Sequence, residues 1–192
     1  MQRLRRLTNH VMANPSSKGL SHQSMLSSQS HKLSTQSSMN DEKERSVLIE
    51  EYSGNYLVTL NRTKALNSLN TDMIHILTPF YEKLVADRKQ CTVVMRGAGD
   101  KAFCAGGDVR KIYDLGKSGA KMEEIMEFFK LEYILDNLLG TLPEYVHNVC
   151  LLNGITMGGG VGLSVHGRYR VANERTLFAM PETGIGFYTD VV

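Results

Sequence analysis

Two glycine-rich segments are the places in this sequence where backbone groups could hold a ligand. Residues 101–108 read KAFCAGGD and residues 154–162 read GITMGGGVG, and each follows an apolar stretch and precedes a predicted helix. Glycines let backbone N–H groups approach a ligand, and a helix start adds partial positive charge, so either segment could hold an oxyanion or a phosphate. The simpler alternative for each segment alone is a tight turn.

The pairing of the two segments favours the oxyanion. The second segment lacks the Gly-Lys-Ser/Thr ending of a nucleotide phosphate loop and the GxGxxG spacing of a dinucleotide fold. A carbonyl oxygen between two helix starts could receive one N–H from each, which would stabilise a thioester enolate or a tetrahedral oxyanion. Losing one donor of this kind typically costs about 3–4 kcal/mol of barrier.

Two carboxylates near the end of the chain could supply acid–base chemistry. Residues 180–190 read MPETGIGFYTD, which places Glu182 between Pro181 and Gly184, directly after an apolar stretch. A carboxylate held on a rigid turn can act as a base. The alternatives are a capping or surface role for Glu182 and a turn-forming role for Asp190.

Other reactive side chains give weaker signals. Cys104 lies in the first glycine segment, but a thiol nucleophile needs a base beside it and none is visible nearby. His75 and His166 are expected to be structural. The three cysteines are odd in number and lack CxxC spacing, so the sequence predicts neither a disulfide framework nor a metal site.

An alternation of strands and helices must position these residues. The apolar patterning predicts strands at 47–51, 56–60, 92–95, 145–152, 169–172 and 177–180, and helices at 71–85, at 122–139, from about 108 and after the second glycine segment. This alternation predicts a layered α/β domain. Pro79 should kink or loosen the first long helix. A sheet with this many strands normally needs further helices to cover it, so we expect a domain that is incomplete at its C-terminus.

Charge is distributed unevenly along the 192 residues. Residues 1–40 hold ten serines and five Lys or Arg without any acid, whereas residues 41–192 hold 17 basic residues and all 20 acidic ones. We therefore expect residues 1–40 to be a disordered mitochondrial transit peptide and residues 41–192 to be the folded part. The alternative for the leader is a disordered tail without a targeting role. No broad cationic surface suggests nucleic acid as a partner, and no apolar run approaches the roughly 20 residues of a membrane span.

Three motifs taken together resemble those of the crotonase superfamily. Residues 101–108, 154–164 (GITMGGGVGLS) and 180–186 (MPETGIG) occur in the order and near the spacing of that superfamily, and residues 61–69 (NRTKALNSL) resemble a further segment of it. They are most similar to its 3-hydroxyisobutyryl-CoA hydrolase branch. The resemblance covers residues 47–192 and implies the N-terminal part of a crotonase-like ββα spiral.

The resemblance implies catalytic roles for particular residues. Gly107 and Gly159 would supply the two oxyanion N–H groups. Glu182 would attack the thioester or activate water, and Asp190 would bind the acyl hydroxyl or assist proton transfer. Hydratases of the superfamily carry a second glutamate three residues after the middle glycine, where this chain has Gly162. The absence of that glutamate favours hydrolysis over hydration.

The resemblance also implies a substrate. Glu132 would contact it, and Lys64, Ala65, Leu66 and Ala105 would line the arm of coenzyme A. The expected reaction is hydrolysis of 3-hydroxyisobutyryl-CoA, or of a similar short 3-hydroxyacyl-CoA, during valine catabolism in the mitochondrial matrix, with no cofactor beyond the coenzyme A of the substrate. The alternatives are an enoyl-CoA hydratase or isomerase, and a catalytically silent fragment or a partner that pairs with intact subunits, with self-association as an open alternative.

Overall fold

The computed structural model of the chain describes residues 45–191. The transit peptide expected at residues 1–40 lies outside the described residues. The described residues all belong to one structural unit. None of its helices combines the length and apolarity needed to cross a membrane.

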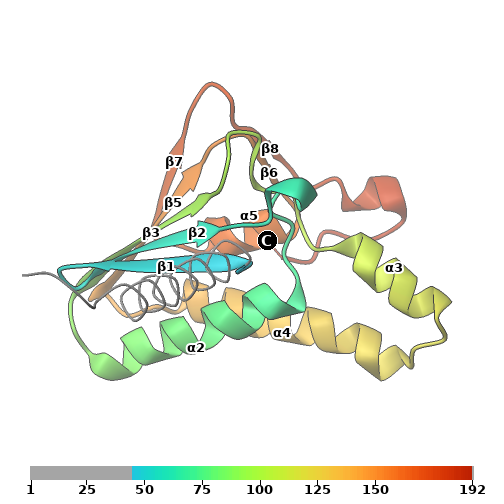
Figure 1. Cartoon of the computed structure of the whole chain (residues 1–192), viewed down its shortest axis with the longest axis horizontal. Coiled ribbons are helices and arrows are strands. Elements are labelled where there is room, and N and C mark those ends of the chain that lie inside the picture. The colour runs from blue at the N-terminus through green and yellow to red at the C-terminus, as the bar shows by residue number, and fades with distance from the viewer. Residues whose placement is uncertain (1–44, 192) are drawn as a thin grey trace, which may run out of the picture. The chain divides into compact units, whose positions relative to one another are not determined.

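A five-stranded sheet forms the larger layer of this unit (Figure 1). Its strand order is β1-β2-β3-β5-β7, in which β1 and β2 form an antiparallel hairpin and the other neighbours run parallel. Every strand that the apolar patterning predicts for this sheet is present. The strands are β1 (Val47–Tyr52), β2 (Asn55–Leu60), β3 (Cys91–Gly97), β5 (Val146–Leu152) and β7 (Tyr169–Ala172).

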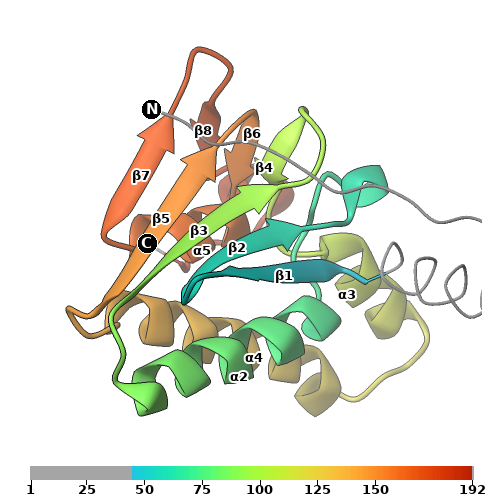
Figure 2. The same cartoon turned by 60° about the vertical axis from the view of Figure 1, so that its left-hand side comes forward.

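Three short strands form a second, parallel sheet in the order β4-β6-β8 (Figure 2). They are β4 (Ala102–Cys104), β6 (Ile155–Met157) and β8 (Leu177–Ala179). The sequence predicts loop at the first two of these, and that prediction is wrong. A three-residue strand contains too few positions for an alternating pattern to be visible, so pairing with neighbours decides its structure.

Two long helices lie against the same face of the five-stranded sheet (Figure 2). They are α2 (Thr71–Asp87) and α4 (Met122–Gly140), and they pack against each other. Asn70 begins α2 by accepting a hydrogen bond from the Met73 N–H at 3.0 Å. The helix runs through Pro79 without a break, although the sequence predicts a kink or a loosened turn there. Because Pro79 is exposed, water can reach the carbonyl that loses its N–H partner.

The buried face of α2 differs slightly from the predicted one. Apolar spacing predicts Ile76 and Phe80 on this face, but both are only partly buried, and Ile74 and Tyr81 are buried in their place. The Tyr81 hydroxyl donates a hydrogen bond to Asn148 Oδ1 on β5 at 2.9 Å. This tertiary contact satisfies the tyrosine inside the core, and no helical periodicity could have revealed it.

The last two strands leave apolar side chains exposed. Tyr169 and Val171 on β7 and Leu177 and Phe178 on β8 are each about half exposed, between 48% and 53%. We call these four residues the β7–β8 patch. They contribute little to the core, which lies between the five-stranded sheet and the helices.

Candidate active site

Three parallel strands bring the candidate catalytic residues to one edge of the small sheet. The strand β4 leads into Gly107, and β6 leads into Gly159. The strand β8 ends shortly before Glu182. Because these strands are adjacent and parallel, the residues that follow their carboxyl ends emerge at the same edge. The small sheet, which the sequence did not predict in full, is therefore what brings the three motifs together.

The first glycine segment is held in place by the backbone of residues 66–69. The Ala105 N–H donates to Leu66 O at 3.1 Å, the Leu69 N–H donates to Gly106 O at 2.8 Å, and the Asp108 N–H donates to Leu69 O at 2.8 Å. This ladder leaves the Gly107 N–H without an acceptor among the described residues. A rigidly held, unpaired N–H is the kind of donor that an oxyanion requires.

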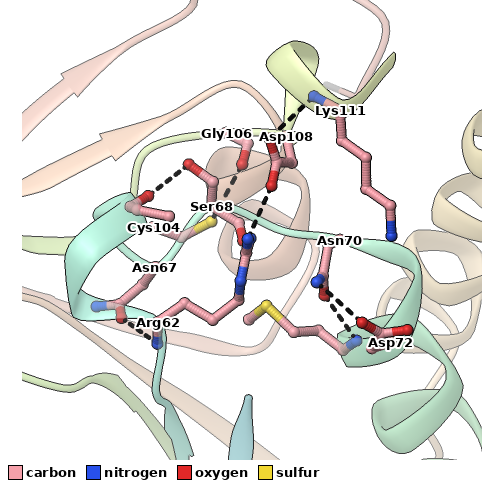
Figure 3. Close-up of polar contacts among 11 residues, drawn as sticks. Arg62, Asn67, Ser68, Asn70, Asp72, Cys104, Gly106, Asp108 and Lys111 are labelled. Carbon is pink, nitrogen blue, oxygen red and sulfur yellow. Dashed lines mark hydrogen bonds and ion pairs between the residues drawn. The ribbon is translucent and has the colours of Figure 1, made fainter. Parts of the chain in front are cut away.

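An ion pair fixes the same segment from the other side (Figure 3). The Arg62 guanidinium contacts Asp108 Oδ2 at 2.8 Å and donates to Ser68 O at 2.5 Å. Asn67 accepts from the Arg62 N–H at 2.9 Å through its side-chain oxygen and donates to Ala102 O at 2.9 Å. Asp108 also begins α3 (Val109–Lys117), as the sequence predicts.

The second glycine segment approaches the first so closely that only glycine fits. Gly158 has a φ of +48°, which side chains rarely tolerate, and it precedes α5 (Gly159–Val165). A Cβ on Gly159 would lie 3.2 Å from the Gly107 nitrogen. The two glycines on which the prediction depends are therefore neighbours in space, although 51 residues of chain lie between them.

A cavity of about 430 Å³ opens at this point, with Ala105 on its wall. The predicted catalytic and acyl-contacting residues all line it, together with aromatic side chains; they are Gly107, Glu132, Gly159, Glu182 and Asp190. The structure thus brings together five residues from four separate segments. Within residues 45–191, no three His, Cys, Asp or Glu side chains are arranged to hold a metal ion.

Glu182 begins a short 3-10 helix, η2 (Glu182–Ile185), and faces the second glycine segment. A Cβ on Gly158 would lie 2.7 Å from Glu182 Oε1. The other carboxylate oxygen, Oε2, is buried and has no hydrogen-bond partner among the described residues. A buried oxygen without a partner is costly, so this carboxylate is available to a ligand in the cavity.

Glu132 is the acid of the cavity whose pKa is raised by its surroundings. It is 3% exposed on α4, and a Cβ on Gly159 would collide with its Oε1. Burial, followed by the negative charges of Asp136, Asp190 and Glu182, raises the pKa of Glu132 to about 8. At neutral pH Glu132 is therefore mainly an uncharged carboxylic acid, able to donate a hydrogen bond.

Asp190 closes the cavity on the side of α4. The Tyr133 hydroxyl donates a hydrogen bond to Asp190 Oδ2 at 2.6 Å, and the rings of Phe129 and Phe187 stack with centroids 5.4 Å apart. Burial and the hydrogen bond to Asp190 raise the pKa of Tyr133. The terminal segment is thereby fixed to α4 by one polar and one aromatic contact.

Asp136 is a buried acid that the sequence analysis missed. It is 6% exposed, and burial, followed by the charge of Asp190, raises its pKa to about 7. A Cβ on Gly162 would lie 2.6 Å from Asp136 Oδ2, so a larger side chain has no room at position 162. The available signal was its spacing, since Asp136 lies one helical turn after Glu132.

The residues expected along the coenzyme A arm are divided between two cavities. Ala105 lines the main cavity, whereas Lys64 and Leu66 line a neighbouring cavity of about 330 Å³ together with Lys101. Ala65 lies between Lys64 and Leu66 but lines neither cavity. Leu66 O accepts the Ala105 N–H, so the two groups of residues are directly connected.

The alternative nucleophile, Cys104, is unsuited to catalysis. It is fully buried on β4, and burial raises the pKa of its thiol to about 12. All three cysteines are free. His75 is exposed on α2, and His166 Nε2 hydrogen bonds to Val191 O at 3.1 Å. None of these side chains lines the main cavity.

The fold and the cavity together define a class of α/β protein in which two glycine loops and a carboxylate surround one site. The sequence model of the enoyl-CoA hydratase/isomerase family matches residues 55–192. The chain belongs to this family, which is the crotonase superfamily, and the predicted family and fold class are confirmed.

Curated relatives are similar to the chain over most of its length. It is 53% identical over 145 residues to the protein of Danio rerio named "3-hydroxyisobutyryl-CoA hydrolase, mitochondrial", and this alignment covers 76% of the chain and 37% of the relative. It is 52% identical over 151 residues to the protein of the same name from Dictyostelium discoideum, with 76% and 39% covered. The chain thus spans less than two-fifths of the length of these relatives.

Solved structures confirm the fold. A carnitinyl-CoA dehydratase from Mycobacterium thermoresistibile superposes with a TM-score of 0.71 at 40% identity, over 77% of this chain and 42% of that one. An enoyl-CoA hydratase from Rhodobacter sphaeroides superposes with a TM-score of 0.70 at 34% identity, over 76% and 42% of the two chains.

Proposed function

We propose that this chain carries the catalytic residues of a thioester hydrolase for 3-hydroxyisobutyryl-CoA, or for a similar short 3-hydroxyacyl-CoA, in valine catabolism. The proposal depends above all on one observation, the adjacency of Gly107 and Gly159 in a cavity that Glu182 also lines. Relatives named as mitochondrial 3-hydroxyisobutyryl-CoA hydrolases at 53% and 52% identity support the choice of substrate.

In the proposed reaction the two glycine N–H groups bind the thioester carbonyl oxygen. As the carbonyl carbon becomes tetrahedral, this oxygen gains negative charge, and the N–H groups of Gly107 and Gly159 stabilise it. The Glu182 carboxylate either attacks the carbonyl carbon or removes a proton from an attacking water. When water attacks, the carbon–sulfur bond breaks and the proton taken up by Glu182 passes to the departing thiolate of coenzyme A. When Glu182 itself attacks, the thiolate leaves as an acyl–Glu182 anhydride forms, and water then hydrolyses the anhydride and supplies the proton that the thiolate takes up.

The remaining cavity residues are proposed to recognise the acyl group. Asp190 accepts a hydrogen bond from the 3-hydroxyl, and the protonated Glu132 donates one to the substrate. Lys64, Ala65 and Leu66 follow the arm of coenzyme A, with Ala105 at the point where the arm enters the main cavity. No cofactor beyond the coenzyme A of the substrate is needed for these steps.

Hydration or isomerisation of an enoyl-CoA is the second candidate, because the solved structures similar to this chain include a dehydratase and a hydratase. The residue at position 162 weighs against hydration, because hydratases of the superfamily carry a glutamate where this chain has Gly162, which lies against Asp136. A glutamate at position 162 would have to displace the Asp136 carboxyl, since a Cβ there already lies 2.6 Å from Oδ2.

The proposed location is the mitochondrial matrix, with residues 1–40 acting as the transit peptide. The relatives are named as mitochondrial, and the leader is basic, serine-rich and free of acids. A third possibility is that the chain acts as a silent partner of intact subunits. The exposed β7–β8 patch favours self-association, because exposed apolar side chains of this kind often mark an interface.

Release of free coenzyme A from 3-hydroxyisobutyryl-CoA tests the proposal. We expect Glu182→Gln to lower the rate by at least about 100-fold, while Glu174→Gln on an exposed turn leaves it unchanged. Normal turnover by Glu182→Gln would refute the mechanism. Addition of water to crotonyl-CoA without release of coenzyme A would identify a hydratase instead.

A further inference from the structure

Two carboxyl groups on α4 face two glycines on α5. Glu132 and Asp136 are one helical turn apart on the buried face of α4. Gly159 and Gly162 are about one turn apart on α5, and a Cβ on either would strike the carboxyl opposite it. The absence of side chains on α5 therefore provides the space that both acids occupy.

No hydrogen bond or ion pair among the described residues explains why position 136 holds an acid. It is 6% exposed, and neither of its carboxylate oxygens has a hydrogen-bond partner among residues 45–191. Burying a carboxyl group without partners destabilises a protein, and an apolar residue of similar size would avoid that cost. Asp136 does not line the main cavity, whereas Glu132 does. Asp136 is therefore one helical turn from a cavity residue without lining the cavity itself.

The acidic neighbours of this pair outnumber the basic ones. Glu182 and Asp190 both act on Glu132, and Asp190 also acts on Asp136. The helix α5 (Gly159–Val165) contributes no titratable side chain, and no ion pair of the described residues involves either acid.

The remaining titratable groups on the surrounding elements are already accounted for. Cys104 on β4 has a thiol whose pKa burial raises to about 12. Tyr81 on α2 is bonded to Asn148, Tyr133 on α4 is bonded to Asp190, and His166 after α5 is bonded to Val191 O. The two acids therefore have mainly each other and further acids as electrostatic neighbours.

We propose that Asp136 is a positioning residue that keeps the Glu132 carboxyl protonated, so that Glu132 presents a neutral O–H beside Gly159. Two adjacent buried carboxyls disfavour a double negative charge, and the proton remains on the one with the greater affinity. Three acids, Asp136, Asp190 and Glu182, act on Glu132, whereas Asp190 acts on Asp136, so the proton is favoured on Glu132. The negative charge of the pair is thereby kept on Asp136, which does not line the cavity.

This arrangement matters for the oxyanion site, a step that rests on the proposed function. A Cβ on Gly159 would collide with Glu132 Oε1, so an ionised Glu132 would put a full negative charge beside one of the two oxyanion donors. That charge would oppose the charge that develops on the carbonyl oxygen. A neutral carboxylic acid at the same place removes the repulsion and adds a hydrogen-bond donor.

The protonation of Glu132 can be measured without substrate, by side-chain carbonyl ¹³C NMR of the full chain labelled at glutamate. We expect one glutamate resonance to titrate well above the ordinary range and to be missing in Glu132→Gln. In Asp136→Asn its midpoint should fall by about 1 pH unit or more. Glu124→Gln, on the exposed face of α4, should leave the midpoint where it is. An unchanged midpoint in a folded Asp136→Asn variant would overturn the proposal.

A second variant covers the case in which Asp136→Asn does not fold. Asp136→Ala removes the same carboxyl group, so it should also lower the midpoint of the Glu132 resonance. An unmoved Glu132 midpoint in folded Asp136→Ala would refute the coupling.

The effect on the reaction is read separately, as the pH profile of coenzyme A release. If activity needs a neutral Glu132, it falls as pH rises through the Glu132 midpoint, and Asp136→Asn should move this alkaline limb to lower pH. A limb that stays in place while the NMR midpoint moves would refute the role in the reaction. Absence of coenzyme A release from the unmodified chain would reject the proposed function and leave the protonation result intact.

Discussion

The helices α2 and α4 pack against the same sheet but bury different kinds of side chain. The buried residues of α2 are Met73, Ile74, Leu77, Tyr81 and Leu84, and the Tyr81 hydroxyl is hydrogen bonded. The buried face of α4 alternates apolar residues with two acids, and neither acid takes part in an ion pair of the described residues.

This difference separates a helix that stabilises the fold from one that also serves the cavity. Apolar burial on α2 lowers the free energy of the folded state, whereas burial of carboxyl groups on α4 opposes folding. A position that is unfavourable for stability and lies beside a cavity often has a functional reason. The contrast therefore agrees with a catalytic role for α4 and a structural role for α2.

The largest expected effect is on the apolar face of α2. Leu77→Ala should lower the free energy of unfolding by about 2–5 kcal/mol, because Leu77 is fully buried and the variant leaves a cavity. Ile134→Ala on α4, at a side chain 45% exposed, is the matched control and should cost much less. Chemical denaturation of both variants measures the difference, and equal losses would contradict the packing of Leu77 in the core.

A second effect is expected from pH, and it should be confined to α4. Because the folded-state pKa values of Glu132 and Asp136 are raised, the native state binds more protons than the unfolded state between about pH 4 and pH 8. The free energy of unfolding should therefore be greatest below this window and fall as the pH rises across it. Asp136→Asn should make the free energy of unfolding depend less steeply on pH. Tyr81→Phe on α2 should lower the free energy of unfolding without changing its dependence on pH. A slope in Asp136→Asn equal to that of the unmodified chain would contradict the assignment.

The smallest effect concerns the fit between α4 and α5. Gly162→Ala should destabilise the chain by about 1–3 kcal/mol, because the new Cβ lies 2.6 Å from Asp136 Oδ2. In an Asp136→Ala background the same substitution should be neutral or stabilising, since alanine favours a helix. Thermal unfolding of the four proteins completes a double-mutant cycle, in which simple additivity would count against the contact.

The sequence predicts the strands of the large sheet and the long helices well, because each has enough residues for its periodicity to be visible. It does not predict β4 and β6, each of which has three residues. It identifies Gly107, Gly159 and Glu182 through linked motifs, but gives no weight to Asp136. An acid on a helix usually faces solvent, and only the packing of α4 against α5 makes this one buried.

The amino-acid sequence by itself determined the family, the glycine loops and the acids that surround the cavity, since these depend on residue types at fixed spacing. The tertiary structure decided which of these residues meet. Parallel pairing of β4, β6 and β8 brings Gly107, Gly159 and Glu182 to one edge, because parallel strands end on the same side of a sheet. Burial decided protonation as well, because a carboxyl group removed from water among other acids favours its neutral form.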